Sequence, residues 1–447
     1  MLVNTYKLKM IFTGLAVVFF YAAQAQVLPL QQCIDTAMLY NKNLQIQRNH
    51  VDISNQKREE IKGNLLPKVS VNADYKYFTN LPYQLMPMSV FGGPQGKYKE
   101  TQFGVPHNIN GNLQLTMPLY NPQINGAVQS AEIGIELTNL QLKKTEEQIY
   151  FEISNLYYNA QILIHQIQFI DSNLANTNKL LRNIQLLREQ LMATGTDVNK
   201  VALQVGQLNT QREIIKSKEE QVLQALKFAM GVSSEKILEV EKIITYGTAP
   251  DYNSKPTIDM QIIAAQNRML IIDLSNLKKT ALPTVALFGT YGTNGFGYDK
   301  KPDNFLKFHP IGFAGIQFNW MLFDGNVLRK KRNQKEIEIR NNELQQSMVN
   351  DQNGMQVENA MNQKRVAQNS IMLNESQIEQ AQSIYEQTII QQKQGVANLN
   401  DVLMADNALR EVQQSYLYSV VDYLKADLEL KKLTGNLSIK PARRGGN

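Results

Sequence analysis

The sequence predicts a mainly α-helical chain with a small β part, in which very long coiled-coil helices alternate with four strands. Three observations predict this fold class. Proline is absent from residues 123 to 249 and again from 311 to 440, so little interrupts a helix there. Short segments within 66–120 and 282–323 alternate apolar and polar residues with the period of two that is typical of strands. The two halves of the chain also repeat the same order of segments.

The first 25 residues are expected to be a secretory signal peptide. Lys7 and Lys9 precede an apolar segment from Met10 to Ala23, and the small-residue segment AQA ends the pattern. This apolar segment is shorter than the ~20 residues of a membrane-spanning helix, so a retained anchor is the weaker interpretation. Without these residues, two of the 46 basic residues are lost and 44 remain against 40 acidic ones. That balance gives no reason to expect nucleic acid as a partner.

An internal repeat organises the remainder. LLPKVSV in the first half reappears as ALPTVAL at an offset of 216, GNLQLTMPLYN is matched by AGIQFNWMLFD at 203, and Gly195 is matched by Gly395 at 200. The repeat therefore predicts the same order in each half: a shorter helix, two strands joined by a loop, a very long helix, a glycine turn and another shorter helix. The expected segments are a first helix at 26–65, strands at 66–120, helices at 121–255, a short helix at 256–281, strands at 282–323, helices at 324–435 and a flexible tail at 436–447.

Each predicted strand has one apolar and one more polar face, and the apolar faces are expected to meet lipid. The residues chosen for the lipid-facing positions are Val69, Val71, Leu113, Leu115, Val285, Leu287, Phe318 and Trp320. In the second strand Tyr120 is expected on the polar face. The glycine-rich connections 79–110 and 293–310 are expected to be loops that face outward from the cell.

Four strands cannot close on themselves in a membrane, where every backbone polar group needs a partner. A barrel of about eight strands is filled by its own side chains. Three copies would supply twelve strands and leave room for a lumen, so the sequence predicts a homotrimer with a β-barrel.

The long proline-free stretches predict coiled coils. Apolar residues of the first stretch follow the alternating spacing of a heptad seam: Ile149, Ile153, Leu156, Ala160, Leu163, Ile167, Ile170 and Leu174. A helix over residues 123 to 193 would extend ~107 Å, more than three times the hydrocarbon core of a bilayer, so it must leave the membrane. Shorter helices at 30–63 and 197–230 together nearly match that length and are expected to stack end to end beside it.

The sequence predicts no catalytic, cofactor or metal site. The four histidines, His50, His107, His165 and His309, form no metal pair of the H-x-x-x-H kind, and no nucleophile, base and orienting acid form a recognisable set. Met86 and Met88 leave soft-metal binding open beside an ordinary loop role. Cys33, the only cysteine, is expected to be an unmodified helix residue, with a free surface thiol as the alternative.

The duplicated LP-x-V strand starts, the MPLYN and MLFDG strand-to-helix junctions and the GVANLNDVL turn resemble the TolC family of outer-membrane efflux channels. The resemblance runs from Leu28 to about Gly435. It implies a trimer with a twelve-strand barrel in the outer membrane and an α-helical barrel in the periplasm. It also implies a periplasmic adaptor and an inner-membrane pump as partners, and a role as a passive gated duct for drugs, metals or polypeptides. The alternative is a secreted coiled-coil structural or adaptor protein without a membrane channel.

The resemblance also implies a periplasmic gate. In the family a glycine turn is followed six and nine residues later by aspartates that constrict the entrance. Here Gly395 is followed by Asp401 at the first position, whereas Met404 occupies the second. Asp401 has a second interpretation, as an acid that stabilises the start of a helix. Lys200, in the turn that contains Gly195, is either an ion-pair partner of Asp401 or a solvated lysine.

Overall fold

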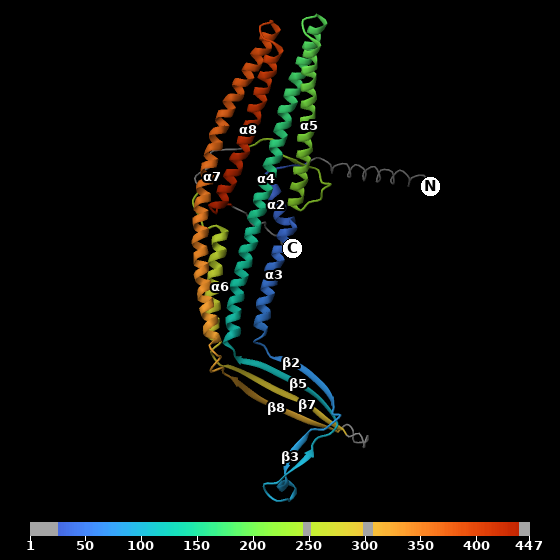
Figure 1. The fold of residues 1–447 in the computed structure, drawn as a ribbon, viewed down its shortest axis with the longest axis vertical. Coiled ribbons are helices and arrows are strands. Elements are labelled where there is room, and N and C mark those ends of the chain that lie inside the picture. Colours follow the sequence, from blue (N-terminus) through green and yellow to red (C-terminus); the bar gives the residue numbers. More distant parts are fainter. Residues whose placement is uncertain (1–25, 245–251, 298–306, 438–447) are drawn as a thin grey trace, which may run out of the picture. The chain divides into compact units, whose positions relative to one another are not determined.

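The computed structural model describes residues 26–244, 252–297 and 307–437 (Figure 1). The expected signal peptide and residues 438–447 of the expected tail lie outside this part. The described chain is mainly helical with a small β part, which confirms the coarse fold expected from the sequence. Two compact units are present. The helical unit comprises the chain up to residue 50, 138–263 and 345 onward, and the sheet unit comprises 51–137 and 264–344.

Seven α-helices are described. They are α2 (Leu30–Tyr40), α3 (Lys42–Gly63), α4 (Pro122–Glu189), α5 (Gly195–Met230), α6 (Ile258–Lys279), α7 (Val327–Lys393) and α8 (Leu399–Leu433). The two longest, α4 and α7, contain 68 and 67 residues. Pro122 stands at the first position of α4, where its missing N–H costs no helical hydrogen bond. Beside it the Asn121 side chain accepts a hydrogen bond from the backbone N–H of Gln123 at 3.1 Å. A strong local start signal therefore converts a strand into a helix within two residues.

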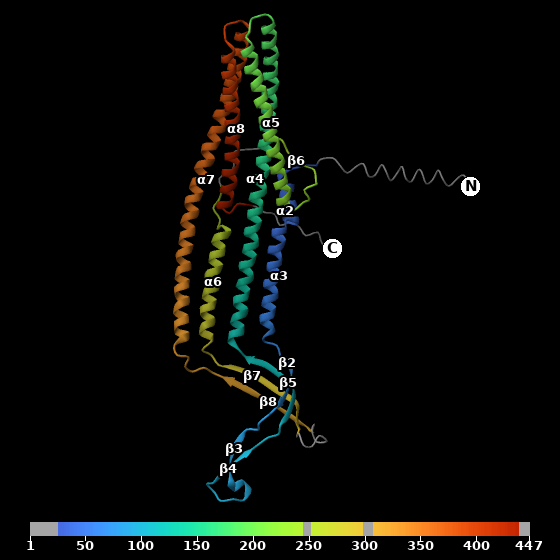
Figure 2. The same ribbon diagram turned by 45° about the vertical axis from the view of Figure 1, so that its right-hand side comes forward.

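In the helical unit, α5 runs beside the second half of α4, and α8 runs beside the second half of α7 (Figures 1 and 2). Their apolar faces share one core near the helix turns, to which all four helices contribute: Leu180, Ile184, Val198, Val201, Ala381, Tyr385, Leu399, Val402, Ala405 and Leu409. In the heptad seam of α4, Ile149, Ile153, Ala160 and Ile170 are buried, and the other seam residues are half-buried. Coiled-coil spacing thus selects the packed face.

The N-terminal helix expected over 30–63 is interrupted at Asn41. The Asn41 side chain accepts from the Leu44 backbone N–H at 3.0 Å and donates to the Ala229 carbonyl at 2.7 Å. Here the end of α5 meets the start of α3, and a Cβ on Gly231 would lie 2.3 Å from the Tyr40 carbonyl oxygen. Gly231 also has a φ of 73°, which glycine adopts without strain. The start of α3 therefore meets the end of α5, as the expected stacking of 30–63 on 197–230 requires, but α2, the first part of 30–63, packs on α5 in a common core.

A short parallel pair of strands, β1 (Gln26–Leu28) and β6 (Leu238–Val240), packs on the same core as α2. The Tyr157 hydroxyl donates to the Leu28 carbonyl at 3.0 Å and accepts from the Glu241 backbone N–H at 3.1 Å. Cys33 is fully buried in this core, and burial raises the pKa of its thiol to about 12. The alternative of a free surface thiol is therefore wrong.

The sheet unit contains four antiparallel strands in the order β2 (Lys68–Tyr77), β5 (His107–Tyr120), β7 (Thr284–Gly297) and β8 (Lys307–Asn319). Within the described chain, β2 and β8 are the two edges (Figure 2). The connection after β2 is not simply a loop. It folds into an antiparallel hairpin of β3 (Tyr83–Pro87) and β4 (Tyr98–Gln102), with a short 3-10 helix, η2 (Met88–Phe91), between the two strands.

In the same unit α4 packs closely on α6 at Gly126. The Asn276 amide donates to the Gly126 carbonyl and to the Ser130 hydroxyl, both at 2.9 Å, and Ser130 donates to Asp273 at 3.0 Å. A Cβ on Gly126 would lie 2.1 Å from the Asn276 side chain. Because Gly126 has no side chain, Asn276 of α6 can reach the backbone of α4. In the chain, α4 follows β5 and α6 precedes β7.

Candidate functional site

The two turns at the ends of α4 and α7 have the same backbone structure. Leu191 has a φ of 63° and Gly395 a φ of 74°, so each turn has one residue in the left-handed region. The next N–H, from Met192 or Val396, reaches back to the Leu187 or Gln391 carbonyl at 2.8 or 2.9 Å. This is the Schellman motif, which satisfies carbonyls at the end of a helix.

Both following helices begin with a capping box. The Thr194 hydroxyl accepts from the Asp197 backbone N–H at 3.2 Å, and the Asp197 carboxylate accepts from the Thr194 N–H at 3.0 Å. The Asn398 side chain accepts from the Asp401 N–H at 3.1 Å, and the Asp401 carboxylate accepts from the Asn398 N–H at 2.8 Å. Asp401 therefore stabilises the helix start, as one of its two interpretations states.

The structural offset between the two turns is 204, not the 200 suggested by matching Gly195 to Gly395. Leu191 corresponds to Gly395, and Asp197 corresponds to Asp401, because they hold the same hydrogen-bonding positions. Gly195 is instead the first residue of α5. The sequence interpretation missed Asp197 because glycine identity set the alignment. The repeated pattern of a capping residue followed three positions later by aspartate would have found it.

The other residues of the expected gate lie in or near the same turns. With the offset of 204, Lys200 occupies the place that Met404 holds in the second turn. The Lys200 ammonium donates to the Asn400 side chain at 3.1 Å, so its partner here is the residue beside Asp401. Met404 is 71% exposed, whereas Val402 is fully buried. The second acidic position of the family is thus an exposed thioether in one turn and a lysine in the other.

Behind the second turn lies a buried polar network that the sequence did not reveal. Asp406 is 3% exposed, pairs with Arg410 and accepts a hydrogen bond from the Gln204 amide at 2.8 Å. Arg410 also donates to the Thr177 hydroxyl at 3.3 Å, so the network joins α8 to α4 and α5. Burial raises the pKa of the Asp406 carboxyl and lowers the pKa of Arg410. Desolvation is therefore the largest influence on both charges despite their pairing.

The register of the four strands places the expected lipid-facing residues on a common face. Directly paired residues point to the same side of a sheet, and Val69 pairs with Leu115, Val71 with Leu113. The face continues through other direct pairs: Leu113 with Tyr291, Met117 with Leu287, Leu287 with Ile316, and Val285 with Phe318. Most of these side chains are exposed in the single chain; Val71, Ile316 and Phe318 are examples.

Three details differ from the expected strand pattern. Trp320 lies just beyond β8, where its ring N–H donates to the Ala281 carbonyl at 3.1 Å. A bulge between Pro118 and Tyr120 brings Tyr120 opposite Val285, which is on the apolar face rather than the polar one. The opposite face is also less polar than expected, because Phe288 and Phe313 pack edge to face there with ring centroids 6.2 Å apart.

Residues 278–436 match the family model described as outer membrane efflux protein. The chain contains an outer membrane efflux protein domain. The resemblance stated from the sequence is therefore confirmed, and the efflux-channel interpretation is supported over a secreted coiled-coil protein. No curated protein matches the chain in sequence.

Solved structures of outer-membrane channels share the fold of this chain. The VceC outer membrane protein of Vibrio cholerae is 15% identical with a TM-score of 0.72, and the match covers 91% of this chain and 96% of VceC. The CmeC channel of Campylobacter jejuni is 12% identical with a TM-score of 0.70, covering 91% and 85% of the two chains. The open-state MtrE channel of Neisseria gonorrhoeae is 12% identical with a TM-score of 0.68, covering 91% and 88%.

Neither a membrane-spanning helix nor a metal cluster is present in the part of the chain that the structure describes. In residues 26–244, 252–297 and 307–437, no helix combines the length and apolar character needed to cross a membrane. The same residues contain no group of three or more histidine, cysteine, aspartate or glutamate side chains arranged to hold a metal ion. Met86 lies in β3 and Met88 begins η2, so the two methionines of the soft-metal alternative belong to the β3–β4 hairpin.

Proposed function

We propose that three copies of this efflux protein form an outer-membrane exit channel, with a twelve-strand barrel in the membrane and a helical tunnel in the periplasm. The single observation that carries the proposal is the four-stranded sheet with one apolar face and two edges that lack a neighbour in the described chain. In lipid such edges must be paired. Joining β2 of one copy to β8 of the next satisfies both edges, and three copies supply twelve strands with a lumen.

The strand register supplies a matched test. Leu115 pairs with Val69 and Gly289 on the apolar face, whereas its neighbour Thr116 pairs with Lys68 and Phe288 on the other. Leu115→Arg should cost ~2 to 4 kcal/mol if this face meets lipid near the bilayer midplane. Thr116→Arg should be tolerated, because it points to the lumen.

The measurement is the amount of heat-modifiable trimer in outer-membrane fractions. Loss of trimer only in Leu115→Arg supports the assignment. Equal amounts of trimer in the two variants would contradict the lipid-facing sheet, and a stable monomer in the soluble fraction would favour the secreted alternative.

We also propose that Asp401 contributes to an acidic constriction, together with Asp197. Both carboxylates occupy the same place in their turns, and each lies at the N-terminus of a helix. Carboxylates gathered around a threefold axis attract cations and repel anions. Lys200 and Met404 occupy the position where the family has its second aspartate, and neither adds negative charge. Cation selectivity should therefore depend on two equivalent carboxylates in each chain.

Single-channel recording in planar bilayers tests this gate. Asp401→Asn and Asp197→Asn should each reduce cation preference and block by multivalent cations added from the periplasmic side, and the double variant should lose more than either. Unchanged selectivity in the double variant would mean that the two residues only cap helices, and the constriction would then be sought elsewhere.

A periplasmic adaptor and an inner-membrane pump are the proposed partners. Leu191, Met192 and Val396 are apolar, belong to the two turns, and are 94%, 73% and 76% exposed. Exposed apolar groups gathered at a loop mark interaction surfaces. These residues give an adaptor an apolar contact at the turns, and the pump supplies the cargo to a duct that is itself passive.

A further inference from the structure

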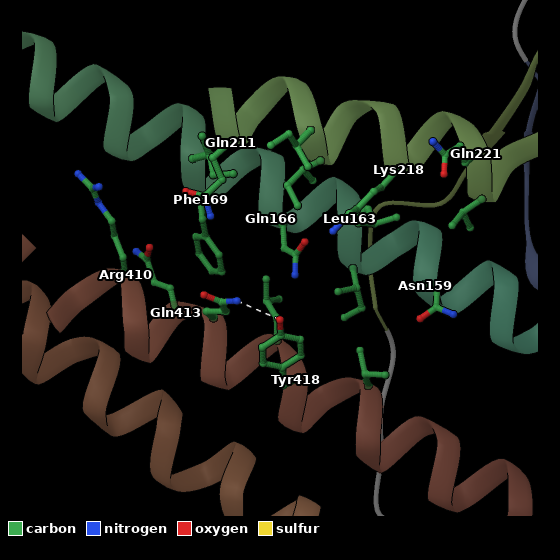
Figure 3. Close-up of a pocket in the computed structure, with 18 of the residues that line it drawn as sticks. Asn159, Leu163, Gln166, Phe169, Gln211, Lys218, Gln221, Arg410, Gln413 and Tyr418 are labelled. Carbon is green, nitrogen blue, oxygen red and sulfur yellow. Dashed lines mark hydrogen bonds between the residues drawn. The ribbon is translucent and has the colours of Figure 1, made fainter. Parts of the chain in front are cut away.

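A cavity of about 790 Å³ lies between α4, α5 and α8, within the helical unit (Figure 3). It is separate in sequence from the turns and from the sheet. Most of its buried lining residues are apolar: Ile162, Ile170, Leu208, Leu417 and Val421. The two buried polar ones, Asn173 and Gln413, hydrogen-bond each other at 3.0 Å. A pocket of this volume with an apolar interior is typical of small-molecule sites, which span roughly 300 to 1,000 Å³.

The rim of the cavity is positively charged. Lys218 on α5 and Lys425 on α8 are both exposed lining residues. Within the described residues neither forms a salt bridge with a carboxylate. Asp422 also lines the cavity, and the charge of Arg410 is balanced by its pairing with Asp406. Two lysines against one free aspartate leave a net positive charge at the opening.

Aromatic and amide groups lie between the apolar interior and this charged rim. Figure 3 shows Phe169 and Gln166 pointing from α4 toward Gln413 and Tyr418 on α8. The Tyr418 hydroxyl accepts a hydrogen bond from the Gln414 amide at 2.9 Å. The cavity lining thus changes from apolar side chains at its floor, through aromatic and amide groups, to lysine ammonium groups at its rim. An amphiphile with a negatively charged end requires its surroundings in this order.

We propose that this cavity binds a single-chain amphiphile with one anionic head group, such as a carboxylate. Its chain would contact the residues around Leu417, and its head group would lie near Lys218 and Lys425. A partner helix is the less suitable occupant. Helices dock through rows of apolar anchors in open grooves, whereas Ile162, Leu208 and Leu417 here are nearly or fully buried. A narrow acyl chain reaches such a floor more readily than a helix does.

Photolabelling of the full chain tests the proposal without measuring transport, so its failure can be distinguished from failure of the channel proposal. The protein, held in an uncharged amphiphilic polymer, is irradiated with dodecanoate that carries a diazirine on its chain. Labelled peptides are then mapped by mass spectrometry. Label should concentrate in residues 159–173, 208–225 and 410–425. Unmodified dodecanoate should compete, whereas dodecyltrimethylammonium should not.

Matched variants identify the role of the charges. Lys218→Glu combined with Lys425→Glu should weaken labelling about tenfold or more, because the charge-assisted contacts of the head group are lost. Lys216→Glu is the control, since this exposed lysine of α5 does not line the cavity. Ile214→Trp, at a half-exposed lining position, should fill the opening and also reduce labelling.

Equal competition by the cationic and anionic amphiphiles would overturn the proposal, as would equal labelling of the wild type and the double lysine variant. Label confined to the strands would show that the probe binds only the lipid-facing surface and would also overturn it. Protection of the cavity by a coiled-coil hairpin peptide, without competition by dodecanoate, would assign the site to a partner helix instead.

Discussion

The two helix turns have the same backbone but differ in the residues that form it and in what lies behind them. Each has a Schellman motif followed by a capping box. The left-handed position is Leu191 in the first turn, where the side chain is 94% exposed, and Gly395 in the second. Backbone hydrogen bonds therefore preserve the turn even where a residue with a Cβ is strained. The repeat is conserved in geometry more than in residue type.

The larger difference is the buried ion pair of the second half. With the offset of 204, Asp406 and Arg410 correspond to Ala202 and Gly206 of α5, which have no charge to pair. The charged pair lies on α8 alone, and it ties that helix to α5 through Gln204 and to α4 through Thr177. The two halves thus share their turns but not the polar contacts that fix them, and variants can separate these contributions.

The largest expected effect is at the buried pair. Arg410→Leu leaves the Asp406 carboxylate buried without its cation and should lower the free energy of unfolding by ~3 to 5 kcal/mol. Replacing both residues with leucine should cost less than the single change, because no unpaired charge remains. Chemical denaturation followed by helical circular dichroism measures both.

The corresponding position in the first half provides the control for that experiment. Gly206→Ala should stabilise the protein by about 0.5 to 1 kcal/mol, because a Cβ there would meet nothing within 4 Å and alanine favours a helix interior. A single Arg410→Leu variant as stable as the double variant would contradict the importance of pairing.

Substituting the left-handed residues should change the free energy of unfolding by an intermediate amount, with opposite sign in the two turns. Gly395→Leu should destabilise by ~1 to 2 kcal/mol, because a side chain is strained at positive φ. Leu191→Gly should relieve strain of the same kind, offset in part by the greater entropy of glycine in the unfolded chain. If Leu191→Gly lowers the free energy of unfolding by as much as Gly395→Leu does, the two turns are not equivalent.

Substituting the capping residues should give the smallest changes in the free energy of unfolding, and these changes should be nearly equal in the two turns. Thr194→Ala and Asn398→Ala should each cost about 1 kcal/mol, because each removes the acceptor for an N–H of the first helical turn. Thr194→Ser is a matched control that keeps the hydroxyl. A cost confined to one of the two turns would break the equivalence of the capping boxes.

The pH dependence of the first box sharpens this test. Hydrogen bonds from Thr194 hold the pKa of the Asp197 carboxyl below its usual range. The lower folded pKa means that its contribution is present above the unfolded pKa of about 3.9 and is lost as the pH falls through the folded value. Asp197→Asn should remove this part of the acid dependence. An unchanged slope of stability against pH below about pH 4 would contradict it.

Much of the fold could be predicted because its signals are local. Most of each proline-free stretch is helical in the structure, and alternation of apolar residues identified a face that the register confirms for Val69, Val71, Leu113 and Leu115. Prediction failed where a distant contact decides the conformation. Asn41 interrupts a helical pattern because its side chain bonds the Ala229 carbonyl, which is 188 residues away.

The sequence by itself determined the long helices, the four amphipathic strands and the capping of the helices after the turns. Each of these depends on neighbours within a few residues, through helical spacing, strand alternation or a hydrogen bond from position i to i+3. Only the tertiary structure decided that Leu191 is the counterpart of Gly395, and that a bulge turns Tyr120 to the apolar face. It also decided that the Asp406–Arg410 pair, whose spacing of four residues is local, is buried beside Gln204. The reason is that strand pairing and burial between distant segments set the last two features, whereas local backbone hydrogen bonds form the turn at Leu191 without requiring glycine there.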